Sequence, residues 1–323
     1  MGIAAGTCAI LNPCITIIRS ASSDRMITVA TAAWRDLNLL DPDSVVDKNK
    51  QAGWDLPRLT KRMTTLLDDA DVIAKARLLA SSTKESGSWL HALPLSSVGN
   101  HLDDAALKVA VALRLGAKIC SPHRCICGKE ADCYGHHALS CIKSRGRSKR
   151  HASLNEVIRR ALPSANIPAI LEPNGLSNSD GKRPDGLTQF TWKGGKCLIW
   201  DVTCVDTVAL SYIASTSANP GGAADHAEAA KRIKYAELED RFCFVPVGFE
   251  TFGSWGKSAT VFVADIARQI MDRTGEPRSA EFLRQRISIE IQRGNAASVF
   301  GTTDMPKGSD DVFFLLGSDH VNS

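Results

Sequence analysis

The chain of 323 residues has no long apolar run and no recognisable targeting signal. No stretch approaches the roughly 20 consecutive apolar residues of a membrane-spanning helix. The apolar segment 9–18 is interrupted by Asn12 and Pro13, and no basic residues precede it as they would in a cleavable signal peptide. We therefore expect a soluble intracellular protein with reduced thiols and no membrane partner.

The chain also lacks a strong charge of either sign, an internal repeat and a low-complexity tract. Its 39 basic and 35 acidic residues give a net charge of only +4, which indicates no particular class of partner. Apolar residues make up 44% of the chain, which is enough for a core, and the length fits one large or two modest domains.

Basic residues are nevertheless concentrated in one segment, residues 143–160, which contains a single acid, Glu156. Such a cluster is usually a solvated face. Beside a phosphate-cleaving site it would instead bind the backbone of a nucleic acid. The basic residues of this segment are Lys143, Arg145, Arg147, Lys149, Arg150, Arg159 and Arg160.

The ten cysteines are unevenly placed, and five of them lie within residues 120–141. Clustered cysteines in a reducing compartment favour a metal site over disulfides. In this segment a Cys-x-Cys-Gly turn presents two thiolates, and a His-x-x-x-Cys pair lies one helical turn apart. Four such ligands complete a tetrahedral structural Zn²⁺ site, so we assign no catalysis to it. The expected ligands are Cys125, Cys127, His137 and Cys141, with Cys133 and His136 as alternatives that spacing does not exclude.

Apolar periodicity and turn residues divide the rest of the chain into helices and strands. Helical spacing over residues 56–79 and 103–115 predicts two packing helices in an accessory N-terminal region. The part after the cysteines alternates helices and strands. Its expected elements are a helix at 153–162, strands at 168–172, 187–192 and 197–205, a helix at 225–238, a strand at 242–251, and helices at 259–273 and 280–294.

The third strand, residues 197–205, is nearly continuous in apolar residues apart from Asp201. A buried carboxylate requires a partner or a metal ion. Because side chains alternate along a strand, Asp201 shares its face with Ile199 and Thr203. Asp185, at the start of the adjacent antiparallel strand, can lie beside it. Two carboxylates in one cleft bind Mg²⁺ or Mn²⁺, so we expect both to be metal ligands and catalytic residues.

The helix at residues 225–238 carries a lysine that can reach these carboxylates. Lys231, Lys234 and Tyr235 share one face of it at spacings of three and four residues. An ammonium group beside the carboxylates can orient the attacking water, help to deprotonate it, or neutralise a pentavalent phosphate. Lys231 can do so while an apolar stripe of the same helix packs on the sheet.

This order of elements, with Pro184-Asp185 and Asp201, resembles the PD-D/E-x-K nuclease superfamily. More narrowly, the chain resembles the restriction-like endonuclease region at the C-terminus of the reverse-transcriptase proteins of non-LTR retrotransposons. The resemblance covers residues 52–301, and the combination of a zinc knuckle with the nuclease motif is its specific feature. The matching segments are residues 125–141, Asp180-Gly181-Lys182-Arg183-Pro184-Asp185-Gly186, Trp200-Asp201-Val202-Thr203, Lys231-x-x-Lys234-Tyr235 and Gln292-Arg293-Gly294-Asn295-Ala296-Ala297.

The resemblance implies an α/β fold with a restriction-endonuclease-like core of helix, three strands, helix and strand, preceded by a helical region and a small zinc knuckle. It divides the chain into four segments. These are residues 1–118 (helical accessory and linker region), 119–142 (zinc knuckle of the CCHC type), 143–301 (endonuclease domain) and 302–323 (C-terminal tail).

One departure from the superfamily concerns the catalytic lysine. Thr203 stands where that lysine usually follows the second carboxylate. In the retrotransposon branch the lysine lies on the following helix, which maps it onto Lys231, with Lys234 as the alternative. Glu156, on the first helix of the core, would be an additional catalytic acid.

The implied function is a metal-dependent DNA endonuclease that nicks target DNA to prime reverse transcription, with catalytic Mg²⁺ or Mn²⁺ and structural Zn²⁺. Its partners would be double-stranded DNA and element RNA, in the nucleus or otherwise the cytoplasm. The chain resembles only the tail of such a protein, because its Asp-Asp pairs at 68–69 and 103–104 fall in helical patterns unlike a polymerase site. The alternatives are a non-catalytic nucleic-acid-binding remnant of a decayed element and a host repair or resolvase-like nuclease of the same fold.

Overall fold

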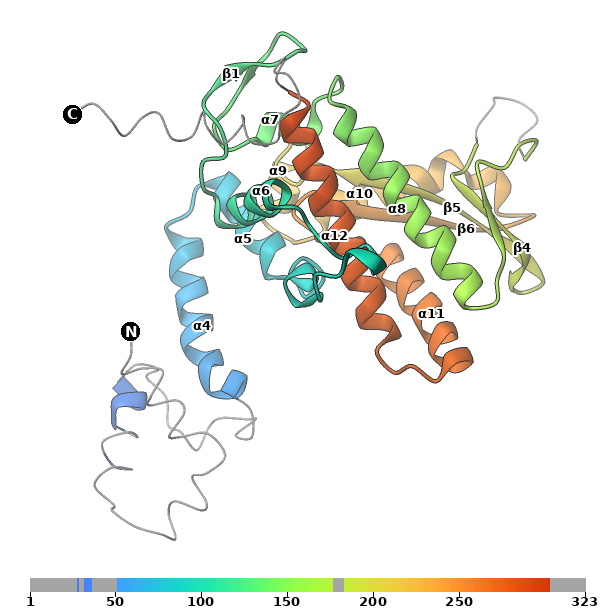
Figure 1. The fold of residues 1–323 in the computed structure, drawn as a ribbon, viewed down its shortest axis with the longest axis horizontal. Coiled ribbons are helices and arrows are strands. Elements are labelled where there is room, and N and C mark those ends of the chain that lie inside the picture. The colour runs from blue at the N-terminus through green and yellow to red at the C-terminus, as the bar shows by residue number, and fades with distance from the viewer. Residues whose placement is uncertain (1–27, 29–31, 37–50, 177–182, 303–323) are drawn as a thin grey trace. The chain divides into compact units, whose positions relative to one another are not determined.

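The computed structural model describes residues 28, 32–36, 51–176 and 183–302. Two compact units, Met1–Asp71 and Val72–Ser323, make up the chain. The first contains helix α4 (Gln51–Asp68), and every other element named below belongs to the second (Figure 1). Residues 180–182 of the nuclease motif and the expected tail beyond Thr302 lie outside the described residues.

None of the described helices is both long and apolar enough to cross a membrane.

The second unit is a mixed α/β structure. In chain order the elements are α5 (Val72–Ser82), η2 (Ser88–His91), η3 (Ser96–Val98), α6 (Asp104–Leu115), β1 (His123–Arg124), β2 (Glu130–Ala131), α7 (His136–Ser140), α8 (Arg145–Ser164), β3 (Ala169–Leu171), β4 (Gly186–Lys193), β5 (Lys196–Val205), α9 (Ile213–Thr216), α10 (Gly222–Lys234), η4 (Ala236–Leu238), β6 (Cys243–Glu250), α11 (Lys257–Thr274) and α12 (Ser279–Phe300).

The single helix expected at residues 56–79 is wrong, because the structure has α4 and α5 with a break between them. Three aspartates fall within residues 68–71, at this break. Aspartate favours caps and turns over helix interiors, since its carboxylate competes for nearby backbone amides. The other helix expected in the N-terminal region is found as α6, one residue shorter at its start.

A four-stranded mixed sheet forms the centre of the second unit. Its strand order is β3-β4-β5-β6, with β3–β4 and β4–β5 antiparallel and β5–β6 parallel. The β4–β5 hairpin turns at Gly194 and Gly195, which both have positive φ. A parallel pair requires a crossover, and α10 supplies it between β5 and β6. The α/β class is therefore confirmed, with α8, β3, β4, β5, α10 and β6 following one another along the chain.

Helices cover both faces of this sheet. On one face Trp200 and Val202 of β5 lie in one buried cluster with side chains of α8, α11 and α12. On the other face Ile199 packs against Tyr235 and Leu238, which follow α10. The expected alternation along the third strand is therefore confirmed, and Asp201 lies on the α10 side.

Helix α8 begins at Arg145, before the start expected at Ser153. Its first turns are rich in basic residues, but one of these, Arg150, is buried and packs against other helices. Arg150 is 1% exposed, donates to Asn295 Oδ1 at 2.9 Å, and donates to the carbonyl oxygen of Leu139 at 3.1 Å. One guanidinium thus joins α8 to α12 and to α7.

Two glycines allow α8 and α12 to approach closely. A Cβ atom at Gly146 would overlap the backbone of Ser298, and one at Gly294 would overlap the side chain of Arg150. Both glycines lie within helices, where alanine is otherwise the better helix former. Close packing, and not helix propensity, therefore explains glycine at these two positions.

Replacing Gly146 by alanine should lower the free energy of unfolding by about 1–3 kcal/mol, because the added methyl group overpacks the contact. The matched control is Gly87→Ala, since a Cβ there meets Arg114 at an ordinary 3.5 Å and the φ of −91° suits any residue. Urea unfolding of both variants measures the difference. Equal stability of the two would contradict the close α8–α12 contact.

Candidate functional site

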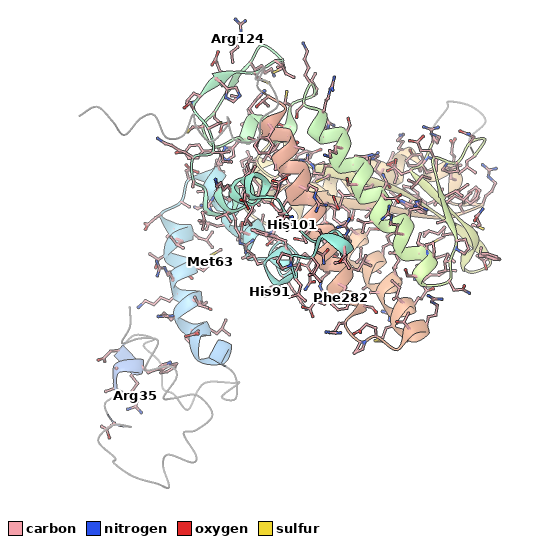
Figure 2. The ribbon with its side chains drawn as sticks, in the orientation of Figure 1. Arg35, Met63, His91, His101, Arg124 and Phe282 are labelled. Carbon is pink, nitrogen blue, oxygen red and sulfur yellow. The ribbon has the colours of Figure 1, made fainter. Side chains whose placement is uncertain are left out.

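Three cysteines and one histidine form a compact cluster beside the β1–β2 hairpin, from which Arg124 projects (Figure 2). The ligand atoms of the four residues all lie within 4.8 Å of one another. Cys125 Sγ is 3.6 Å from Cys141 Sγ, and Cys127 Sγ is 3.3 Å from His137 Nε2. The cluster can therefore hold a metal ion, and its members are the four residues expected from the sequence.

Local turns bring the four side chains together. Gly128 has a φ of +87°, a conformation that glycine adopts without strain, and its amide donates to the Cys125 carbonyl at 2.7 Å. Asp132 caps α7, because its carboxylate accepts a hydrogen bond from the His137 amide at 3.0 Å. This cap fixes the start of the short helix that carries His137 and leads to Cys141.

The alternatives Cys133 and His136 do not belong to the cluster formed by the described residues. The His136 ring stacks on Tyr134 with their centroids 5.7 Å apart, and its Nδ1 faces Asp132 at 3.8 Å. The carbonyl of Cys133 accepts a hydrogen bond from the Ile119 amide at 2.7 Å. The structure thus separates the four members of the cluster from the two alternatives that spacing alone left open.

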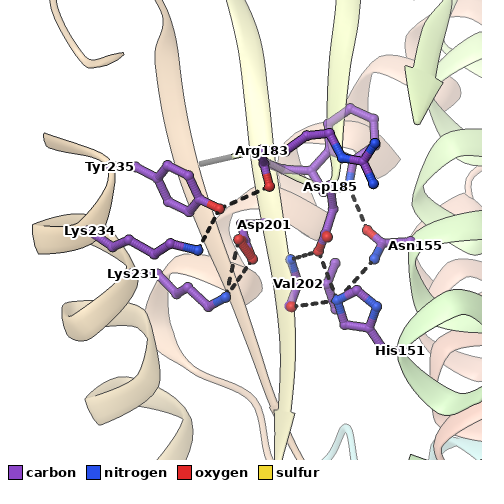
Figure 3. Close-up of polar contacts among 10 residues, drawn as sticks. His151, Asn155, Arg183, Asp185, Asp201, Val202, Lys231, Lys234 and Tyr235 are labelled. Atoms are coloured by element: carbon purple, nitrogen blue, oxygen red, sulfur yellow. Dashed lines mark hydrogen bonds and ion pairs between the residues drawn. The ribbon is translucent and has the colours of Figure 1, made fainter. Parts of the chain in front are cut away.

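A second site lies at the middle of β5, around the charge that interrupts this strand. Asp201 is 3% exposed, and Lys231 Nζ lies 2.7 Å from its Oδ1 and 3.1 Å from its Oδ2 (Figure 3). The buried carboxylate therefore has the partner that its burial requires. The lysine side chain is 27% exposed, so the ion pair lies at the edge of solvent.

Two buried glutamates fix α10, which carries this lysine, against β6. Glu250 accepts hydrogen bonds from two amides in the first turn of α10, at 2.9 and 3.2 Å. Glu228, on α10, accepts one from the Gly248 amide of β6 at 3.0 Å. Burial raises the pKa of both glutamates. These contacts hold α10 in the position that brings Lys231 to Asp201.

Asp185 lies directly before β4, and the β4–β5 register pairs the next residue, Gly186, with Trp200. Continuing that register places Asp185 opposite Asp201. Asp185 Oδ2 accepts a hydrogen bond from the Val202 amide at 2.7 Å. Gly186 is required here, because a Cβ atom would overlap the Trp200 ring. The two carboxylates therefore flank the same part of β5 (Figure 3).

His151 and Asn155 of α8 contact Asp185, and neither was expected from the sequence. His151 Nε2 is 3.0 Å from Asp185 Oδ2 and 3.1 Å from the carbonyl oxygen of Val202. Asn155 Oδ1 accepts a hydrogen bond from Trp200 Nε1 at 3.0 Å. Their spacing of four residues places both on one side of α8. This signal was hidden because the expected helix began only at residue 153.

Hydrogen bonds shift the pKa values of Asp185 and His151. Burial opposes the ionisation of Asp185, but hydrogen bonds from His151 and Asn155 keep the pKa of Asp185 below its usual value. The same contact with Asp185 raises the pKa of His151. Asp201 and Lys231 also act electrostatically on His151. Charged groups on both sides of β5 therefore affect the pKa of His151.

Lys234, the alternative to Lys231, is turned to a different partner. Its Nζ lies 3.0 Å from the hydroxyl of Tyr235, and that buried hydroxyl donates to the carbonyl oxygen of Arg183 at 3.0 Å. Tyr235 thus helps to hold the segment that leads into Asp185. Of the two lysines, the structure places Lys231 against Asp201 (Figure 3).

Glu156, expected as an additional acid, is not brought to the carboxylates. It accepts hydrogen bonds from Arg159 at 2.7 Å and from Arg160 at 2.6 Å. The Arg159 and Arg160 contacts lower the pKa of Glu156 to about 2. With Phe282 it lines a cavity between α8, α11 and α12. A helix turns by about 100° per residue, so Glu156 lies off the side of α8 that carries Asn155.

The basic segment divides into three parts in the structure. Arg150 is buried, and Arg159 and Arg160 are paired with Glu156. The remaining basic residues are exposed at the start of α8, between the cysteine cluster and His151. They are Lys143, Arg145, Arg147 and Lys149.

No protein-family model matches this chain, and no curated protein matches its sequence. A proposal for the function therefore has to rest on the chemistry of the two sites. One site brings three cysteine sulfurs and one imidazole together. The other pairs Asp201 with Lys231 and Asp185 with His151.

Replacing Asn155 by alanine should lower the free energy of unfolding by about 1–3 kcal/mol, because the buried Trp200 Nε1–H then loses its hydrogen bond to Asn155 Oδ1. Asn219→Ala is the control, since Asn219 is exposed. Denaturant unfolding followed by tryptophan fluorescence measures both variants. An Asn155→Ala protein as stable as the parent would show that this hydrogen bond does not support the site.

Proposed function

We propose that this chain is a metal-dependent DNA endonuclease with a restriction-endonuclease-like core. Asp185 and Asp201 are the proposed ligands of Mg²⁺ or Mn²⁺, and Lys231 is the proposed catalytic lysine. The observation that carries the proposal is the arrangement of these three residues around one part of β5. Carboxylate oxygens are ligands that both cations prefer.

The order and pairing of the strands also support this proposal. One carboxylate precedes the second strand of the sheet and the other lies within the third, where the two strands pair antiparallel. The lysine comes from the crossover helix between β5 and β6. This is the placement that the resemblance to the PD-D/E-x-K nucleases led us to expect, with the lysine moved from Thr203 to Lys231.

The residues of the site have complementary chemical roles in phosphodiester hydrolysis. A divalent cation supplies Lewis acidity toward the phosphate and activates water. Asp185 and Asp201 would hold the cation, and the ammonium of Lys231 can orient the attacking water and neutralise charge on the phosphate. The Asp185 side chain is 18% exposed and that of His151 44% exposed, so a substrate can approach from the α8 side.

Duplex DNA is the proposed substrate. The exposed basic residues at the start of α8 lead toward His151, and such residues bind backbone phosphates regardless of base sequence. By its resemblance to the retrotransposon endonucleases, the chain would nick target DNA in the nucleus to prime reverse transcription, with element RNA as a second partner.

The proposed occupant of the cysteine cluster is Zn²⁺. Three thiolates and one imidazole are a usual ligand set of structural tetrahedral zinc. Four protein ligands leave no open position for a substrate, so this ion would stabilise the knuckle and take no part in hydrolysis. Its binding energy would contribute to the folding of a short segment that has little core of its own.

Asp185→Asn and Asp201→Asn should each abolish Mg²⁺-dependent nicking of supercoiled plasmid DNA, because each removes an anionic ligand. Binding to the same DNA in a mobility-shift assay should remain, which shows that the variants are folded. Glu156→Gln is the matched control and should nick at the parental rate. Undiminished nicking by both aspartate variants would refute the proposal, and salt-sensitive binding without cleavage by the parent would favour a non-catalytic remnant.

Cys127→Ser and Cys141→Ser should each release the metal from the cluster, because each removes one thiolate ligand. Cys133→Ser, in the same segment but outside the cluster, should retain it. Elemental analysis of the purified proteins measures the zinc content. The proposal expects one zinc per parent chain, and a parent without bound zinc would contradict it.

A further inference from the structure

A groove of about 770 Å³ lies between α8, α11 and α12, which pack against one another (Figure 1). Its floor is apolar, because Val157, Ala161 and Leu283 reach it from the main buried cluster. Phe282 also lines the groove, and 45% of its surface is exposed (Figure 2). A concave apolar surface of this size is typical of a binding site.

The rim of the groove is positively charged overall. Its three glutamates each pair with an arginine that lies outside the groove. The pairs are Glu156 with Arg159, Glu276 with Arg278, and Glu290 with Arg293. Three further arginines line the groove itself, namely Arg160, Arg273 and Arg286. These groups comprise six arginines and three glutamates, which leaves a net charge of +3.

The arginines of the rim repel one another. Burial lowers the pKa of Arg286, and the charges of Arg293 and Arg160 lower it further, against the opposing effect of Glu290. The guanidinium of Arg273 donates to the carbonyl oxygen of Ser164 at 2.7 Å and makes no ion pair with any described residue. A ligand that carries carboxylates would relieve this repulsion. If it also carried apolar side chains, it would cover the floor of the groove.

The chain itself contains a segment of this chemistry after Thr302. Residues 303–323 lie outside the described residues, and their sequence holds four aspartates against one lysine. Two of these aspartates, Asp310 and Asp311, directly precede the five apolar residues 312–316. Acidic and apolar groups thus adjoin in this segment, as basic and apolar groups do in the groove.

This segment is close enough along the chain to reach the groove. The chain leaves α12 beside the start of α8, because a Cβ atom at Gly301 would lie 2.9 Å from Ser144 Oγ. The groove begins at Ala152, about 12 Å further along α8, and extends to the end of that helix, about 30 Å along it. An extended chain spans about 3.3 Å per residue, so the eight residues from Thr302 to Asp310 reach about 26 Å.

We propose that the groove between α8, α11 and α12 binds residues 310–316 of the same chain. Phe313 and Phe314 anchor the segment on the apolar floor, and Asp310 and Asp311 pair with the arginines of the rim. The short connection gives the segment a high effective concentration at the groove. The contact uses neither the cysteine cluster nor the carboxylates at β5, so it does not rest on the proposed nuclease function.

Photo-crosslinking of the full chain tests where this segment lies. Phe314→p-benzoylphenylalanine places a photoreactive ketone in the apolar run, and mass spectrometry of the digested product identifies the residues that it joins. The expected crosslinks lie within one chain and join this residue to positions 152–164 of α8 or 279–290 of α12. Crosslinks between two chains would show that a second copy supplies the segment. Such crosslinks, crosslinks to other surfaces, or none would overturn the inference.

Charge reversal tests the pairing at the rim. Asp310→Arg with Asp311→Arg alters only the tail and should lower the yield of the groove crosslink by about fivefold or more, because each attraction becomes a repulsion. Arg160→Glu with Arg273→Glu should lower it similarly, and combining all four changes should restore it.

Arg268→Glu is the matched control, because Arg268 lies on α11 outside the groove with its side chain 63% exposed. It should leave the crosslink yield at the parental value. An unchanged yield in the tail variant would contradict the inference, whether or not the groove variant folds.

Proteolysis of the full chain gives a readout without the photoreactive group. Chymotrypsin cleaves after accessible phenylalanines, so binding in the groove should protect the bonds that follow Phe313 and Phe314. The tail variant should be cleaved there about fivefold faster or more, since cleavage follows the population of the open state. The combined variant should return to the parental rate. Equal cleavage rates in the parent and the tail variant would overturn the inference.

Discussion

The placement of both sites depends on the hydrogen bonds of one buried group, the guanidinium of Arg150. It joins α8 to Asn295 of α12 and to the carbonyl of Leu139, in the short helix that carries His137 of the cysteine cluster. A buried cation requires such partners, because burying it without hydrogen bonds would destabilise the fold by roughly several kcal/mol. Gly146 and Gly294 make the approach of the two helices possible. One rigid helix thus connects the cysteine cluster to the carboxylates.

The carboxylate site is shaped from both faces of the sheet. From the α8 side, Asn155 and Trp200 define where Asp185 lies, and Gly186 leaves room for the indole. From the other side, buried glutamates tie α10 to β6 and present a lysine to the strand. Because the two sides meet at β5, the charges of the site are held by separate elements and not by one flexible loop.

The sequence was sufficient to predict those site residues that a single local pattern marks. Asp201 was found because it interrupts a strand that is otherwise apolar. The members of the cysteine cluster were found because their spacing matches a turn and a helix. His151 and Asn155 were missed because the basic residues before them concealed the start of α8. Arg150 was read with those basic residues as exposed, since burial by a distant helix leaves no local signal. Glu156 was assigned from its place on the first helix of the core, but its helical phase directs it to two arginines instead.

Crystals of the full chain soaked in Mn²⁺ offer the most direct test of the proposal that Asp185 and Asp201 together hold a catalytic cation. Anomalous scattering at the manganese edge locates the ion independently of any activity. The account predicts an anomalous peak in contact with both carboxylates, beside Lys231. A well-ordered site with no peak there, in crystals that hold Mn²⁺ elsewhere, would contradict it.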